Sequence, residues 1–257
     1  MSEIEAIFGI GPLFFVAAFG VTLAAGFVKG TVGFAMPTIM ISVLGSFLSL
    51  EVALAALIGP TLLTNIWQAM RQGLGNAVQS VLRFKRFLLI GLMFLVVSAQ
   101  LVRMLPTGVL FLSIGAPVVL FALAQLFGWR PRFAPERRSF AEAILAAIAG
   151  FCGGLSGVWG PPTVAYLTAM DTPKAEHVRV QGVIYGLGAL ALLLAHIQSG
   201  VVRGETMPLS LAMLLPAGLG MWIGLQFHDQ MDQERFRVAT LVVLVLAGLN
   251  LIRRGLM

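Results

Sequence analysis

Long stretches without a charged residue are the feature that most limits how this chain can fold. The uncharged windows are 6–28, 30–50, 52–70, 87–102, 104–129, 143–170, 180–202, 206–228 and 238–252. A helix needs about 20 apolar residues to cross the hydrocarbon core of a bilayer. With 58% apolar and 11% charged residues, the composition also lies outside that of soluble domains. We therefore expect an all-α, polytopic (multi-pass) protein of the cell inner membrane.

Window 143–170 cannot form one continuous helix. It contains the pair Gly153-Gly154, then Gly157, then the run Gly160-Pro161-Pro162, and proline removes a helical hydrogen bond. The window predicts a helix, a break near 154–161, and a second short helix. Counting both parts gives about ten apolar segments, of which eight to ten are expected to be transmembrane. Because unpaired backbone is not tolerated against lipid, the broken or re-entrant helix should be buried in protein or line a cavity.

The same glycine-rich pattern occurs earlier, at a constant offset of 124 residues. Residues 25–37 read AGFVKGTVGFAMP and residues 149–161 read AGFCGGLSGVWGP, so that Ala, Gly, Phe, Gly, Gly and Pro coincide. The offset is close to half of 257 residues, which favours a duplication into halves 1–129 and 130–257 within a single membrane domain. The alternative is that these small residues serve only close helix packing. Duplicated halves with interrupted helices are typical of secondary transporters with a site near the midplane.

These two motifs resemble those of the sulfite exporter family (TauE/SafE), also called the toluene sulfonate uptake permeases. The family carries AGFxxGxxG followed by proline once in each half, and the second copy, extended to Pro162, is the closer match. The first copy has Phe34-Ala35-Met36 where the family usually has glycines. The resemblance implies transport of organosulfonates, sulfite or related sulfur oxyanions, and sometimes small carboxylates.

The positions of lysine and arginine predict the orientation in the membrane. With ten segments and the acidic N-terminus outside, 13 of the 17 basic residues lie inside, most of them in the loops 71–86 and 130–138. If each glycine motif instead interrupts one spanning helix, eight spans result. Eleven basic residues then lie inside and five outside, with Lys29 inside the membrane. The first arrangement makes the halves inverted repeats, and we favour it.

An anion site needs hydrogen-bond donors in a shielded place, and helix N-termini offer unpaired N–H groups with a partial positive charge. The short helices expected to begin near Pro37 and Pro161 provide two such ends. Glycines before them would let the backbone approach a ligand, and two hydroxyls could add donors. The candidate ligands from the two motifs are Gly30, Thr31, Gly33, Gly154, Ser156 and Gly157.

Side chains outside the glycines add further candidates. Lys29 stands between uncharged runs and is either an interfacial residue or a buried counter-charge for the substrate. Gln181 and Tyr185 share one helix face, and Asn65 ends an earlier segment. Trp159 lies inside the second break, where it would cover a pocket or mark a membrane boundary.

Other classes of function are less well supported. A passive anion channel would use the same donors. Ser156 and His196 could form the dyad of an intramembrane protease of the rhomboid type, but the repeat explains the glycines without a nucleophile, and we predict no enzyme activity. One cysteine and three histidines without metal-ligand spacing predict no metal and no cofactor.

The expected partners are a small anionic substrate, lipid, and H⁺ or Na⁺ as coupling ion. Nucleic acid is excluded, and a homo-oligomer is left open.

Overall fold

The fold of the chain was obtained as a computed structural model, which describes residues 3–129, 133–170, 172–227 and 233–257. All regular secondary structure in these ranges is helical. The helices are α1 (Glu3–Phe8), α2 (Pro12–Val32), α3 (Met36–Leu44), α4 (Leu50–Met70), α5 (Leu74–Arg83), α6 (Lys85–Leu101), α7 (Thr107–Leu126), α8 (Pro135–Ser156), α9 (Gly160–Ala169), α10 (Lys174–Gln198), α11 (Met207–Ala212), α12 (Leu214–Phe227) and α13 (Gln233–Leu256). The expectation of an all-α protein is confirmed.

Seven segments in the described ranges are long and apolar enough to cross a membrane. They correspond to α2, α4, α7, α8, α10, the α11–α12 pair and α13. Eight to ten spans were expected, and the difference has a simple physical reason. The apolar segments α3 and α9 have only 9 and 10 residues, and α6 has 17, so none reaches the length of about 20 that a full crossing needs. The chain is a multi-pass membrane protein.

The first glycine motif forms a sharp helix end followed by a short second helix. Helix α2 passes through Lys29 without interruption and ends at Val32. Gly33 adopts φ +87°, a left-handed conformation that favours glycine, and its N–H donates to the carbonyl of Lys29 at 2.7 Å. Helix α3 then begins at Met36 with proline in its first turn. The helix expected near Pro37 is confirmed.

The second motif repeats this construction. Helix α8 ends at Ser156, Gly157 has φ +72°, and its N–H donates to the carbonyl of Gly153 at 2.7 Å. Helix α9 begins at Gly160. The predicted break is confirmed, but it starts at 157 and not near 154. In both motifs the left-handed glycine is the last one of the AGFxxGxxG pattern. The earlier glycines of that pattern therefore remain inside the long helix.

Small residues bring the long helices into close contact. The main pairs are α2 with α12, α6 with α8, α7 with α13, and α4 with α10. A side chain on Gly30 would overlap backbone atoms of Met221 and Gly224 in α12, and one on Gly154 would overlap those of Leu95 in α6. Backbones that approach this closely gain dispersion contacts, which drive helix association in lipid.

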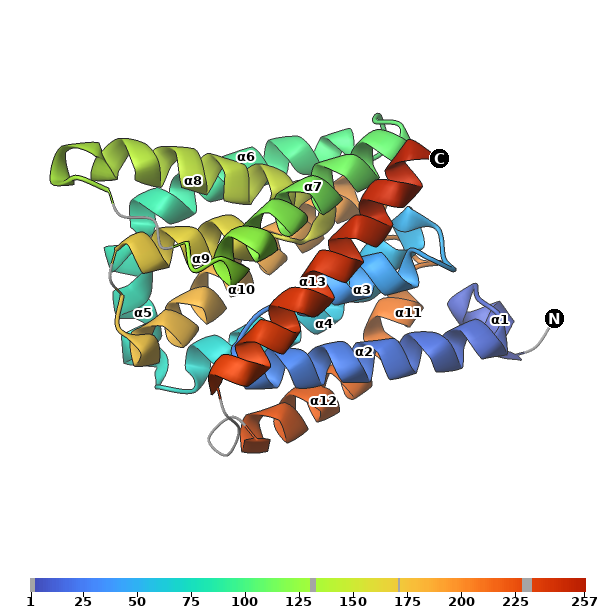
Figure 1. Cartoon of the computed structure of the whole chain (residues 1–257). Helices are drawn as coiled ribbons and strands as arrows, with labels where there is room; N and C mark the ends of the chain where they lie inside the picture. The colour runs from blue at the N-terminus through green and yellow to red at the C-terminus, as the bar shows by residue number, and fades with distance from the viewer. Residues whose placement is uncertain (1–2, 130–132, 171, 228–232) are drawn as a thin grey trace.

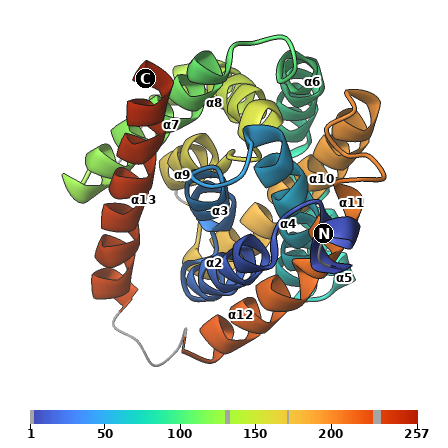
Figure 2. The same ribbon diagram turned by 90° about the vertical axis from the view of Figure 1, so that its right-hand side faces the viewer.

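The short helices α3 and α9 occupy the interior of the bundle. Figure 2 shows both of them surrounded by longer helices, with α13, α7, α6 and α12 on the outside. Helix α3 contacts α2, α4 and α13, and α9 contacts α7, α8 and α10. Both termini lie at the same end of the molecule (Figure 1). The interrupted backbone therefore lies inside the bundle, as a break at membrane depth requires.

Candidate functional site

A cavity lies where the ends of the two interrupted helices meet. It encloses about 360 Å³ of space between atoms, part of it open to solvent. Its wall contains residues 34–38, which connect α2 to α3, and residues 157–161, which connect α8 to α9. The lining residues are Lys29, Phe34, Ala35, Pro37, Thr38, Asn65, Gly157, Val158, Trp159, Gly160, Pro161, Tyr185 and Leu244. The two sequence motifs thus form the walls of one cavity.

Among the described residues, Lys29 is the only charged one in the cavity wall, and it is 1% exposed. Its ammonium group donates a hydrogen bond to the side-chain carbonyl of Asn65, which comes from α4. Among the described residues, no carboxylate forms an ion pair with Lys29. The sequence left open whether Lys29 is interfacial or buried; it is buried. A desolvated cation without a counter-ion is costly unless a ligand supplies the opposite charge.

Further donors lie near Lys29. In the described part of the chain, the amide nitrogen of Asn65 has no hydrogen-bond partner although it is buried. The hydroxyl of Thr38, in the first turn of α3, is a further donor in the cavity wall. Buried polar groups are normally satisfied, so the free amide nitrogen of Asn65 marks a place where a polar ligand would be held.

The first connection also contains a strained residue. Ala35 has φ +82°, and it is the one residue other than glycine with positive φ in the described ranges. Such a conformation costs about 1–3 kcal/mol and persists only where the surroundings enforce it. Ala35 and the start of α3 line the cavity, and the N–H of Phe34 forms no backbone hydrogen bond among the described residues. The helix N-terminus predicted from the sequence does lie at the cavity.

Two glutamines lie next to Gly33, at the end of α2. The Oε1 of Gln181 is 3.2 Å from where a Cβ of Gly33 would stand, and the Nε2 of Gln68 is 3.6 Å from it. Gln68 donates to the carbonyl of Val178 at 2.7 Å, whereas its buried Oε1 has no partner in the described residues. Gln181 was predicted as a ligand, but neither glutamine belongs to the cavity wall itself.

Trp159 and Tyr185 form the opposite side of the cavity. Both are buried, and their ring centroids are 6.1 Å apart. The phenol of Tyr185 donates to the carbonyl of Gly160 at 3.3 Å. The indole of Trp159 covers Gly153, where a side chain would overlap the ring. Trp159 therefore covers a cavity inside the bundle and does not stand at the membrane boundary.

Six predicted ligands do not belong to the cavity wall, namely Gly30, Thr31, Gly33, Gly154, Ser156 and Gln181. Gly30 and Gly154 lie inside α2 and α8 and face neighbouring helices. The hydroxyl of Thr31 donates to the carbonyl of Val28 at 2.8 Å, and that of Ser156 to the carbonyl of Cys152 at 2.7 Å. Both hydroxyls are thus bonded within their own helices. The reason is the later helix end described above, which places these positions before the break.

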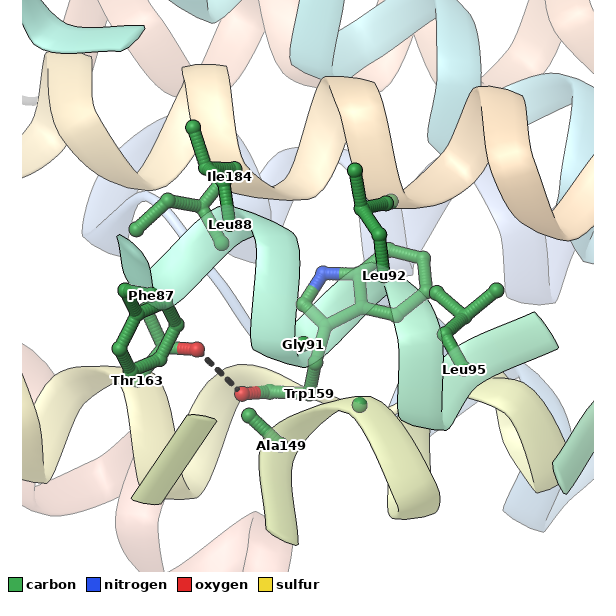
Figure 3. A pocket seen from close by; sticks show the side chains of 11 residues that line it. Phe87, Leu88, Gly91, Leu92, Leu95, Ala149, Trp159, Thr163 and Ile184 are labelled. Carbon is green, nitrogen blue, oxygen red and sulfur yellow. Dashed lines mark hydrogen bonds between the residues drawn. The ribbon is translucent and has the colours of Figure 1, made fainter. Parts of the chain in front are cut away.

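A second cavity, with about 310 Å³ of space between atoms, part of it open to solvent, lies between α6, α8, α9 and α10. Figure 3 shows its wall, which consists of apolar side chains and glycines apart from Thr163. The hydroxyl of Thr163 donates to the carbonyl of Trp159 at 2.8 Å and is therefore already satisfied. Because none of its lining residues is charged, this cavity is a poorer candidate for an anion site than the first.

Sequence reasoning missed Thr38, Phe34 and Gln68. Thr38 follows Pro37 directly, so a hydroxyl in the first turn of the predicted short helix was a usable signal. Gln68 stands three residues after Asn65, which places both on one face of a helix. Phe34 and Leu244 carried no such signal, because they line the cavity only through the tertiary arrangement.

The residues of the hypothetical protease dyad do not act together. The Ser156 hydroxyl donates to Cys152 and accepts from the N–H of Val158. The Nδ1 of His196 lies 3.1 Å from the hydroxyl of Ser199 in the turn after α10. Among the described residues no hydrogen bond joins Ser156 to His196, and the Ser156 hydroxyl is already bonded to Cys152 and Val158, so the pairing that such a dyad requires is not formed.

Taken together, the helices and the cavity define a multi-pass membrane protein with interrupted helices around a buried polar centre. The chain matches the family described as sulfite exporter TauE/SafE over residues 18–251, and it belongs to this family. It is therefore a membrane transporter and not an enzyme. Searches of curated proteins and of solved structures gave no significant match.

Proposed function

We propose that the protein is a secondary carrier of small anions, with organosulfonates, sulfite and related sulfur oxyanions as the main substrates and small carboxylates as further ones. The observation that carries this proposal is Lys29, a buried cation in the wall of the central cavity without a carboxylate partner in the described residues. An anion bound there would supply the missing counter-charge.

The donors around Lys29 suit an oxyanion. The ammonium group, the free amide nitrogen of Asn65 and the hydroxyl of Thr38 come from three helices that surround one cavity. The N-terminus of α3 adds a partial positive charge. A sulfonate has three acceptor oxygens and one negative charge, which a single lysine can balance. The apolar lining at Phe34 and Trp159 would accommodate the organic part of such a molecule.

The arrangement of helices supports alternating access by two inverted halves, 1–129 and 130–257. Helix α2 packs on α12 as α8 packs on α6, and α3 contacts α13 as α9 contacts α7. In Figure 1, α2 begins at the right-hand end, beside α1, whereas α8 begins at the left-hand end. Rocking of such halves around a fixed site is how many secondary carriers work. We propose H⁺ or Na⁺ as the coupling ion.

Tracer exchange in vesicles tests the proposal. Purified protein is reconstituted, the vesicles are loaded with unlabelled anion, and uptake of labelled sulfite, thiosulfate, sulfoacetate or methanesulfonate is measured. A carrier predicts faster uptake when the same anion is present inside, and a passive channel predicts a conductance without this stimulation. Protein that moves none of these anions but moves an unrelated cation would contradict the proposal.

A further inference from the structure

Helix α5 has an apolar face that the rest of the described protein leaves uncovered. Figure 1 shows α5 at the left-hand end of the bundle, where it runs across the direction of α4 and α6. Leu74, Val78 and Leu82 are 62%, 49% and 65% exposed. Because they are four residues apart, they form one stripe along the helix. An exposed stripe of this kind on a helix that lies across the bundle is typical of interfacial helices.

The neighbouring face of α5 is fixed to the bundle. Ala77 packs with Ala69 of α4 and Val183 of α10. The hydroxyl of Ser80 accepts a hydrogen bond from the Nε of Arg179 at 3.0 Å. These contacts hold the helix in one orientation, so the exposed stripe points in a defined direction beside the bundle.

Basic residues flank the stripe. Arg71 precedes α5, and Lys85 and Arg86 follow it. Arg86 donates to Ser139, whereas Arg71 and Lys85 are exposed and form no ion pair among the described residues. The positive-inside pattern predicts that this end of the protein faces the cytoplasm, where the leaflet is rich in anionic lipid.

We propose that α5 lies in the headgroup layer of the cytoplasmic leaflet, with Leu74, Val78 and Leu82 among the acyl chains and Arg71 and Lys85 bound to anionic phospholipid headgroups. The apolar stripe and the two unpaired cations supply the two interactions that bind amphipathic helices to membranes, which are burial of apolar area and attraction to negative lipid. The proposal does not depend on the identity of the transported anion.

The first test measures where the two sides of α5 lie. Cys152 is the only cysteine, so a Cys152→Ser background allows a bimane label at Val78→Cys, with Gln79→Cys, also exposed, as the matched control. The full-length protein is reconstituted in vesicles of phosphatidylcholine with phosphatidylglycerol. Lipids spin-labelled near the headgroup should quench the label at position 78 more strongly, and aqueous iodide the label at position 79. Equal quenching of both labels by iodide would overturn the proposal.

The second test measures the lipid preference. Binding of spin-labelled phosphatidylglycerol is compared with that of spin-labelled phosphatidylcholine, in the wild-type protein and in the double variant Arg71→Gln/Lys85→Gln. We expect the preference for the anionic lipid to fall by roughly fivefold for each charge removed. Arg253→Gln is the control and should retain the preference, because Arg253 is an exposed cation in the last turn of α13, and that helix ends at the opposite end of the bundle from α5 (Figure 1). An unchanged preference in the double variant would overturn the role of these two side chains.

Discussion

The two interrupted helices have the same backbone construction but different side chains at the cavity. Position 29 in α2 is a lysine, and the position 124 residues later, in α8, is Gly153. The lysine extends to Asn65, whereas the space beside Gly153 is filled by the ring of Trp159. The α2–α3 pair, the first hairpin, thus contributes the charge, and the α8–α9 pair, the second hairpin, contributes an aromatic wall.

The glycines that end the two long helices show the same contrast. A Cβ placed on Gly33 would meet the side chains of Gln68 and Gln181, whereas one placed on Gly157 would meet those of Leu57 and Leu192. Leu57 and Leu192 are the positions 124 residues from Gln181 and Gln68. The polar pair and the apolar pair therefore occupy corresponding places. The difference teaches that the shared glycines build the turn, while the residues around them give the two ends different chemistry, and we propose that the polar end recognises the anion.

The largest effect on binding is expected from the charge itself. Lys29→Met should weaken binding of methanesulfonate by about 100-fold, because removing one partner of a desolvated charge pair typically costs 2–5 kcal/mol. Calorimetric titration of the purified protein measures this loss. Thr22→Val, another buried polar position in α2, should change the affinity by less than about twofold. Unchanged binding of methanesulfonate by Lys29→Met would contradict the proposed role of charge in distinguishing the two hairpins.

The helix-crossing glycines should affect stability equally in both halves. Gly30→Ala and Gly154→Ala place a methyl group against the backbone of α12 and α6, which should cost about 1–3 kcal/mol each. Thermal unfolding in detergent measures the cost, and the folded fraction should still bind the anion. Gly20→Ala, in the same helix but with open space around it, is the control. Loss of binding at unchanged stability would instead make these glycines ligands.

The glutamine pair should have an intermediate effect. Gln68→Leu/Gln181→Leu makes the end of α2 resemble that of α8, and we expect about tenfold weaker anion binding from the loss of one or two hydrogen-bonding groups near the cavity. Leu57→Met/Leu192→Met alters the other end conservatively and should leave the affinity within about twofold. Equal effects of the two double variants would remove the distinction between a polar and an apolar end.

The smallest effect is expected at Tyr185. Its hydrogen bond to Gly160 is 3.3 Å long, which is weak, so Tyr185→Phe should reduce affinity by only about twofold. The same titration measures it. A loss similar to that of Lys29→Met would mean that the phenol contacts the anion directly and that the aromatic side also recognises charge.

Much of the fold could be predicted from the sequence, because the breaks are encoded locally. Glycine and proline at 33–37 and 157–162 are sufficient to predict where a helix stops and another begins. The course of α2 was not predictable in this way. A lysine at position 29 marks the end of an uncharged window, but the chain continues as helix to Val32, and Asn65, 36 residues later, accepts the hydrogen bond of the buried lysine. Such a tertiary partner leaves no local signal.

The candidate site was predictable only in part, for the same reason. Lys29, Asn65, Gly157, Trp159 and Tyr185 were named from the sequence and line the cavity. Thr31 and Ser156 were expected to face it, but a shift of one turn in the helix end directs both hydroxyls back to their own helices. Helix ends are uncertain by a few residues in any sequence pattern, and each residue rotates a side chain by about 100°.

We propose that Lys29 binds the negative charge of the substrate, and Asn65→Asp tests this most directly. This substitution keeps the shape of the side chain but places a carboxylate beside the ammonium group. Titration of the purified variant with methanesulfonate should show at least a 100-fold loss of affinity, about 2.7 kcal/mol, with the thermal stability retained or increased. Wild-type affinity in Asn65→Asp would contradict the account, because an anion bound at Lys29 could not tolerate a carboxylate in contact with that lysine.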